Sequence, residues 1–210
     1  PFSTMDKECL AKFYPTSDLV TGPDIIFFWV ARMIMAGYRF AGGKPFGNVF
    51  FTSIVRDLLG RKMSKSLGNS PDPLDLIAKY GADGLRFGLM RIAPTGTDVK
   101  FDEKQIEEGK NFANKLYNAA RFRMMQGAAS TEPAPKFTAV HIDILSKLKE
   151  LHATVAEGLG KYEFNTYTQA LYSFFWNEYC SLFLEAVKND LRDGDAAVKN
   201  ATLYTIDTVL

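Results

Sequence analysis

The chain has 210 residues, of which 47% are hydrophobic and 13% aromatic, and its 25 basic and 24 acidic residues give a net charge of +1. This composition can bury enough apolar surface to offset chain entropy, which excludes disorder as the main description. The longest apolar run, 25–31, is far shorter than the roughly 20 residues that cross a bilayer, and no signal peptide is visible. Two scattered cysteines and two histidines offer neither a disulfide framework nor a metal site, which indicates a reducing, cytoplasmic compartment.

The first half alternates strand-like and helix-like segments. A strand is expected to end at Leu19 and Val20, and the sequence TGPD at 21–24 predicts a turn into a helix, because its glycine permits the turn and its proline suits a first helical position. The helix expected over 24–36 is apolar almost all round, which is typical of a helix packed on a sheet on most of its sides. A second strand is expected over 48–53.

A polar loop bounded by glycines follows over 54–69. The next helix is expected to begin after Asp72 as N-cap, with a proline at its first position, and to end near Tyr80, with Gly81 in the C-terminal turn. A further short helix is expected over 82–91. Strands separated by helices predict a parallel α/β sheet, and two strands are too few to stand alone, so this half looks incomplete.

From about residue 105 the pattern changes to long helices with apolar residues at three-, four- and seven-residue spacings. These helices are expected over 105–125, 142–159, 166–191 and 195–210. The predicted fold is therefore α/β over residues 1–104, followed by an all-α antiparallel helical bundle over 105–210 that stops inside its fourth helix. Both ends suggest a piece of a longer protein.

The loop at 60–69 carries the chemistry. Lys62 and Lys65 are mobile cations that suit phosphate oxygens, and a glycine near each end of the loop would let it swing in and out. The alternative is a solvated surface loop, which short basic runs usually are.

A family resemblance favours the catalytic interpretation. Residues 62–66 read KMSKS, the signature of class I aminoacyl-tRNA synthetases, and a chance match to five fixed residues is expected in roughly one of 10⁴ chains of this length. The segments 13–37, 61–83 and 111–119 resemble the valyl-tRNA synthetase family. The resemblance is strong up to about residue 125 and looser beyond it.

The resemblance implies the C-terminal part of a Rossmann-like catalytic domain and an anticodon-binding bundle. Such an enzyme joins valine to ATP, used with Mg²⁺, and moves the valyl group to tRNA(Val). The parent is expected to be a cytoplasmic, monomeric ligase that binds no membrane and holds no metal in these residues. The family's His-Ile-Gly-His motif, which contacts ATP from the other half of the site, is absent from the sequence, so the chain alone is expected to be inactive.

The same resemblance implies roles for the signature residues. Lys62 and Lys65 would stabilise the leaving pyrophosphate, with Lys65 as the main ATP contact. Ser64 and Ser66 would supply hydroxyl donors, and the backbone of Met63 would lie near adenine. Donors placed where charge develops in the transition state can contribute a few kcal/mol each.

The turn at 21–24 would hold the adenylate through Gly22 and Asp24, with the Asp24 carboxylate accepting the ribose hydroxyls. The alternative for Asp24 is a first-turn carboxylate facing the helix dipole. Ile25 and Trp29 are four residues apart and would line the valine side-chain pocket, although ordinary core packing is the usual role of such pairs.

Four basic residues on the helix over 105–125 are candidates for tRNA contact: Lys110, Lys115, Arg121 and Arg123. No acid lies among them, and they would touch the inner side of the tRNA, unless they form only a solvated face. Two other functions stay open. One is an isoleucyl- or leucyl-tRNA synthetase of the same subclass, which the sequence WVARM at 29–33 disfavours, and the other is a free-standing tRNA-binding module.

Overall fold

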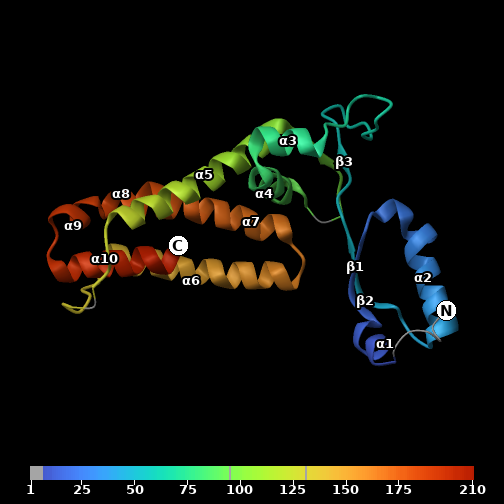
Figure 1. Cartoon of the computed structure of the whole chain (residues 1–210), viewed down its shortest axis with the longest axis horizontal. Coiled ribbons are helices and arrows are strands. Elements are labelled where there is room, and N and C mark those ends of the chain that lie inside the picture. The colour runs from blue at the N-terminus through green and yellow to red at the C-terminus, as the bar shows by residue number, and fades with distance from the viewer. Residues whose placement is uncertain (1–6, 95, 131) are drawn as a thin grey trace.

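The computed structural model of the chain describes residues 7–94, 96–130 and 132–210. The molecule is elongated, with two short strand pairs toward one end and long helices at the other (Figure 1). We call residues 7–102 the first half and residues 103–210, from the start of α5, the helical half. Among the helices of the described residues, none has the length and apolarity that a bilayer crossing requires.

The first half opens with one parallel strand pair joined by a helical crossover (Figure 1). Its elements are α1 (Lys7–Phe13), β1 (Thr16–Thr21), η2 (Pro23–Ile25), η3 (Ile26–Val30), α2 (Ala31–Ala36), η4 (Gly37–Ala41) and β2 (Phe46–Phe51). β1 and β2 pair in parallel, with Thr16 opposite Phe46 and Thr21 opposite Phe51. The predicted parallel pairing of two strands around a helix is confirmed, whereas α1 was not predicted.

The crossover helix is exposed, so the prediction that it packs on most of its sides is wrong. Over 23–41 the buried residues are Val30 and Gly37, while 82% of Phe27 and 65% of Phe28 are exposed. A two-stranded sheet can cover one side of a helix, and the apolar residues on the other sides find no partner among the described residues. The helix is also irregular, because its first turn is a tight 3₁₀ turn and two wide π-type segments flank α2.

The rest of the first half consists of β3 (Val55–Arg56), α3 (Pro73–Tyr80), α4 (Ala82–Ile92) and β4 (Val99–Lys100). α3 and α4 are confirmed, and the side chain of Asp72 caps α3 by accepting a hydrogen bond from the backbone N–H of Leu74 at 2.8 Å. β3 and β4 pair in parallel but were not predicted, because two-residue strands carry no periodic pattern.

The helical half contains α5 (Glu103–Met125), α6 (Ala139–Gly160), α7 (Phe164–Ser173), η5 (Phe174–Phe183), α8 (Leu184–Ala186), α9 (Lys188–Asp193) and α10 (Ala196–Val209). Asp195 caps α10 as predicted, since its carboxylate accepts a hydrogen bond from the backbone N–H of Val198 at 2.9 Å. The predicted single helix over 166–191 is instead interrupted at Val187, and a π-type segment forms its middle.

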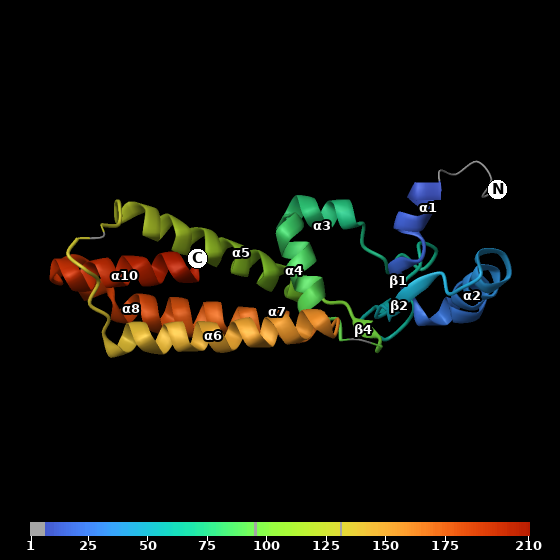
Figure 2. The same cartoon turned by 90° about the horizontal axis from the view of Figure 1, so that it is seen from below.

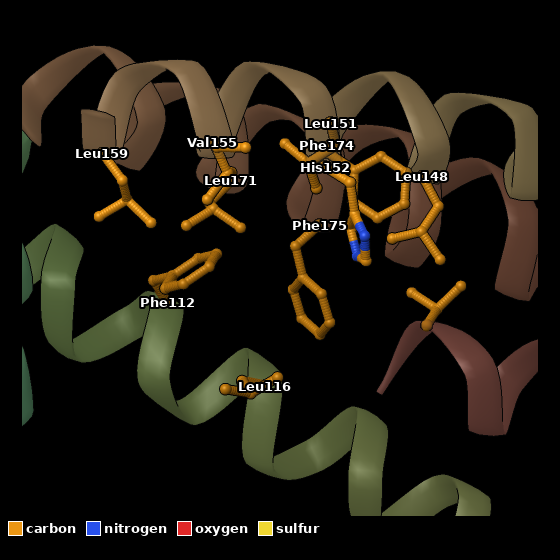
Figure 3. A pocket seen from close by; sticks show the side chains of 12 residues that line it. Phe112, Leu116, Leu148, Leu151, His152, Val155, Leu159, Leu171, Phe174 and Phe175 are labelled. Carbon is orange, nitrogen blue, oxygen red and sulfur yellow. The ribbon is translucent and has the colours of Figure 1, made fainter. Parts of the chain in front are cut away.

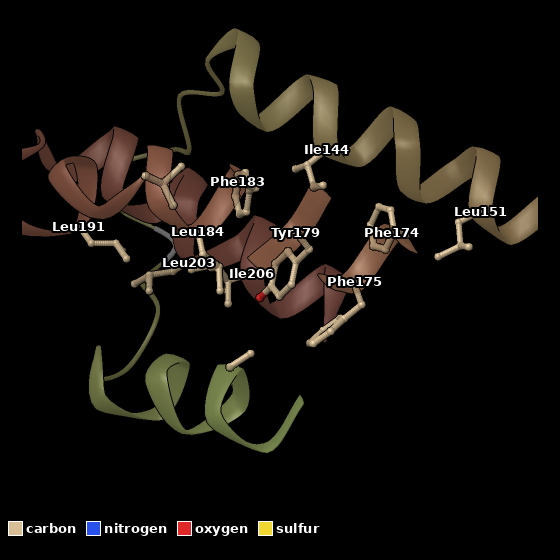
Figure 4. Packing of buried hydrophobic residues seen from close by; sticks show 12 residues of the cluster. Ile144, Leu151, Phe174, Phe175, Tyr179, Phe183, Leu184, Leu191, Leu203 and Ile206 are labelled. Atoms are coloured by element: carbon tan, nitrogen blue, oxygen red, sulfur yellow. The ribbon is translucent and has the colours of Figure 1, made fainter. Parts of the chain in front are cut away.

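The helical half encloses a continuous apolar core between α5, α6, η5 and α10 (Figure 4). Its buried members are Ala119, Ile144, Leu151, Phe174, Phe175, Tyr179, Phe183, Leu184, Val187, Leu191, Leu203 and Ile206. His141 is buried at the edge of this core, where its Nδ1 accepts from the backbone N–H of Thr138 at 3.0 Å and its Nε2 lies 2.8 Å from the Thr202 hydroxyl. Burial lowers the pKa of His141, so the neutral ring is the stable form.

α4 and α5 cross with their backbones in contact, which joins the two halves (Figure 2). A Cβ atom on Gly109 would lie 2.3 Å from the carbonyl oxygen of Gly84, and one on Gly88 would lie 2.6 Å from that of Gln105. Only glycine allows this approach at these positions. Because α4 also packs on α7, the predicted domain boundary after residue 104 stays a prediction.

A second contact joins the sheet to the turn between α6 and α7. The hydroxyl of Tyr162 donates to the Asp18 carboxylate at 2.6 Å, and the Asn48 amide donates to the same oxygen at 2.9 Å. These bonds, that of Tyr162 first, lower the pKa of Asp18. The ring of Phe50 on β2 packs edge-on against that of Phe164, with centroids 5.2 Å apart.

Candidate functional site

The signature loop, defined here as residues 57–69, leaves β3 and leads toward α3 at the top of Figure 1. Gly60 closes its first turn by donating its N–H to the Asp57 carbonyl at 2.9 Å, and Gly68 closes the second by donating to the Lys65 carbonyl at 3.2 Å. Both glycines have a positive φ, +79° and +62°, which favours glycine. The two glycines therefore shape turns at both ends of the loop.

The signature side chains divide into exposed and internal groups. Lys62, Lys65 and Ser66 are exposed, whereas Met63 and Ser64 are half-buried. The Ser64 hydroxyl lies 3.2 Å from that of Ser66 and accepts from the backbone N–H of Leu67 at 3.2 Å. The loop thus presents two exposed ammonium groups and a hydroxyl to solvent, a set that can bind phosphate oxygens.

A carboxylate and an amide hold the base of the loop, and neither was predicted. Asp57 is 9% exposed and accepts hydrogen bonds from the Arg61 backbone N–H at 2.8 Å, the Arg61 Nε at 2.7 Å and the Asn69 amide at 2.9 Å. These bonds, with Asn69 contributing most, lower the pKa of Asp57 to about 2, so this carboxylate stays ionised. The sequence signal that could have indicated the bond between Asp57 and Arg61 is their four-residue spacing with a glycine between them.

The turn after β1 faces the signature loop. The Asp24 carboxylate lies 3.6 Å from the Lys62 ammonium, so the structure brings together two residues that the resemblance assigns to ATP. Gly22 was expected to permit the turn, but its backbone is extended, with φ −76° and ψ 147°, so the turn does not depend on the conformational freedom of glycine. A Cβ atom at Gly22 would instead lie 2.9 Å from the Asp24 Oδ1, and the missing side chain leaves room beside this carboxylate.

Ile25 and Trp29 do not lie on one regular helix. Ile25 has φ −112° and ψ 18°, outside the helical range, and the wide segment η3 begins after it. The four-residue spacing therefore does not rest on one regular α-helix here, and the shared face stays a prediction. Trp29 is 57% exposed and Ile25 is half-buried, and their assignment to an amino-acid pocket stays a prediction.

Comparisons with known proteins show which family the chain belongs to. Residues 1–102 match the family of class I tRNA synthetases (I, L, M and V), and residues 142–210 match the anticodon-binding domain of tRNA ligases. The chain is 50% identical over 207 residues to a valine–tRNA ligase of Bacteroides thetaiotaomicron and 56% identical over 201 residues to one of Phocaeicola vulgatus. These matches cover 97% and 94% of the chain and 23% of each relative, so the chain spans about a quarter of their length.

The chain belongs to the class I tRNA synthetases.

Solved synthetases share the fold over both halves. The methionyl-tRNA synthetase of Mycobacterium tuberculosis, in complex with methionyl-adenylate, superposes with a TM-score of 0.79 at 26% identity over 99% of this chain and 42% of its own. The agnB2 LeuRS of Agrobacterium radiobacter K84 superposes with a TM-score of 0.71 at 17% identity over 98% of this chain and 26% of its own, a likeness of fold alone. Both superpositions therefore include α5, which lies between the two family matches.

The basic residues of α5 do not form one free face in this synthetase chain. Arg123 makes a two-point ion pair with Asp207, at 2.6 and 2.7 Å, and Lys115 lies 4.2 Å above the Trp176 ring. The expectation of a common basic surface is therefore wrong for Arg123, whose guanidinium joins α5 to α10. Lys110 and Arg121 are exposed, and the Lys110 ammonium donates to the carbonyl of Lys79 at 3.3 Å.

A cavity of about 570 Å³ lies between α5, α6 and α7, away from the signature loop (Figure 3). It is lined by Phe112, Leu116, Leu148, Leu151, His152, Val155, Ala156, Leu159, Leu171, Phe174, Phe175 and Val209. The lining contains no carboxylate and no ammonium group, so it does not suit ATP or a free amino acid. Among the described residues, no three His, Cys, Asp or Glu side chains gather as a metal site would require.

Proposed function

We propose that this chain is part of a valine–tRNA ligase, which activates valine with ATP and transfers it to tRNA(Val). The observation that carries the proposal is the juxtaposition of Lys62 and Asp24. It occurs in a chain 50% identical to valine–tRNA ligases over nearly its whole length. The relatives at 50–56% identity favour valine over the isoleucine and leucine alternatives. The ligase would be cytoplasmic and monomeric.

The first half then supplies the C-terminal part of a Rossmann-like nucleotide-binding domain. Valine and ATP, bound with Mg²⁺, give valyl-adenylate and pyrophosphate, and the ammonium groups of Lys62 and Lys65 offset the charge that grows on the leaving pyrophosphate. The hydroxyl of Ser66 and the Met63 backbone contact the nucleotide, and the Asp24 carboxylate accepts the ribose hydroxyls. The Lys62–Asp24 pair is 3.6 Å long and exposed, so it separates at low cost when ATP enters.

Substitution of Lys65 in the full-length protein tests this function. Lys65→Ala is expected to lower valine-dependent exchange of pyrophosphate into ATP by roughly 10²–10³-fold with little change in the KM for valine, because the contact is strongest in the transition state. Lys44→Ala removes another exposed ammonium group, before β2, and serves as the matched control. A full-length wild-type protein with no valine-dependent exchange would refute the proposed function.

We further propose that tRNA lies along α5. Lys110 and Arg121 are eleven residues apart, about three helical turns, so they point to the same side. Replacing both with alanine is expected to raise the KM for all valine tRNAs alike and to flatten its salt dependence, because phosphate contacts carry little sequence information. Pyrophosphate exchange should not change. An effect on one isoacceptor alone would contradict a backbone contact.

A further inference from the structure

The amide of Asn69 holds three separate points of the signature loop. It donates to the Asp57 carboxylate at 2.9 Å and to the Lys62 carbonyl at 3.3 Å, and its oxygen accepts from the backbone N–H of Ser64 at 2.9 Å. One side chain thus ties Asp57, the first residue of the loop, to the backbone on both sides of Met63. The backbone carbonyl of Lys62, the first lysine of the signature, is therefore held by a hydrogen bond from Asn69.

Asp57 completes the arrangement from the other side. Its two oxygens accept from Arg61 and Asn69, so one buried carboxylate holds both ends of the loop together. The backbone also forms an antiparallel bridge between Arg56 and Lys62 at this point. By contrast, Lys62 and Lys65 are exposed, and Lys62 makes its one described side-chain contact with Asp24 at 3.6 Å. The loop therefore combines a hydrogen-bonded base with exposed cations.

We infer that Asp57 and Asn69 are positioning residues for amino-acid activation, and that they hold the signature backbone so that its lysines reach the leaving pyrophosphate. The inference rests on the proposed function. Its physical basis is preorganisation, because cations carried on a fixed backbone need less ordering in the transition state than cations on a flexible one. The described hydrogen bonds of both side chains go to groups of the loop itself, so both residues act through the loop.

An exchange of the two side chains tests the inference in the full-length protein. Asn69→Asp places two carboxylates against each other and is expected to lower kcat for pyrophosphate exchange about 10²-fold, as small misplacements of catalytic groups do, without changing the KM for valine. Asn69→Ala removes the same bonds without adding charge and should have a similar but smaller effect. The double variant Asp57→Asn/Asn69→Asp restores the bond between positions 57 and 69, but not the donor to the Lys62 carbonyl, and should recover part of the loss, about tenfold.

The controls separate positioning from stability. Asp75→Asn, on the exposed side of α3, should leave both kcat and Tm unchanged. A double variant no more active than Asn69→Asp, or losses of kcat that follow losses of Tm, would overturn the inference. So would wild-type activity in Asn69→Ala. Wild-type protein without valine-dependent exchange would instead refute the proposed function, so the two failures are distinguishable.

Discussion

The two halves of the molecule differ in how their apolar side chains are buried. In the helical half, apolar side chains from α5, α6, η5 and α10 meet in one cluster, and Tyr179 and Ile206 have no exposed surface (Figure 4). In the described first half, the buried hydrophobic residues Val30, Phe46, Leu76 and Val99 are spread over separate elements, and the crossover helix is bare. The helical half therefore has an apolar core of its own, whereas the described residues of the first half share no comparable cluster.

The largest expected effect concerns folding of the separate halves. Residues 102–210, which keep the Asp102 cap of α5, should unfold cooperatively in urea, with an m-value of about 1–3 kcal/mol/M because unfolding exposes the buried cluster. Residues 7–101 should show no cooperative transition. The measurement is circular dichroism against urea concentration. A sharp transition in the first-half fragment would remove the difference between the two regions.

Single core substitutions should reproduce the same difference on a smaller scale. Ile206→Ala removes a fully buried side chain of the cluster and should cost about 2–5 kcal/mol of unfolding free energy. Phe28→Ala, on the crossover helix, should change the stability of this chain by less than about 0.5 kcal/mol. Urea unfolding of the 210-residue chain measures both. Equal losses would mean that the crossover helix is covered in solution.

Acid should weaken the helical half through His141. Burial lowers the pKa of this ring in the folded state, so the unfolded chain binds more protons below its ordinary pKa of about 6.5. Stability should be complete above that pH and fall as the pH drops below it. His141→Gln should remove this part of the pH dependence, and His152→Gln, at an exposed position, should retain it. The same slope in all three proteins would contradict the assignment.

Local signals in the sequence predicted much of the fold. The caps at Asp72 and Asp195 are one-turn interactions, so short motifs predicted them correctly. The exposure of Phe27 was not predictable, because an apolar pattern indicates that a helix is to be covered but not by which residues. The break at Val187 was also missed, since the apolar pattern continues across it.

The site residues that belong to a recognisable motif were predictable from the sequence. Those brought together by hydrogen bonds between distant residues were not. The contact of Asp24 with Lys62 follows from residues that the resemblance assigned to one ligand. Asp57 and Asn69 lie outside the five-residue signature, and a single sequence gives no sign that their side chains meet. The bond between Tyr162 and Asp18 joins residues 144 positions apart, a distance that no local pattern spans.

The smallest expected effect lies at that bond between the halves. Tyr162→Phe removes the hydrogen bond that contributes most to the lowered pKa of Asp18, so this pKa should rise toward its ordinary value. Asn48→Ala removes the second bond and should raise it less. Carboxyl chemical shifts measured by NMR against pH report both changes. A larger rise in Asn48→Ala would reverse the order of the two bonds.

The glycine crossing of α4 and α5 is also the point about which α5 would tilt relative to α4. α5 has 23 residues and is therefore about 34 Å long, with the crossing near its first turns. Met125 lies 16 residues, about 24 Å, beyond Gly109, so a tilt of about 5° at the crossing moves the far end of α5 by about 2 Å. A methyl group at Gly109 would push the backbones of α4 and α5 apart. If α5 tilts as a result, its far end moves farther than the residues at the crossing.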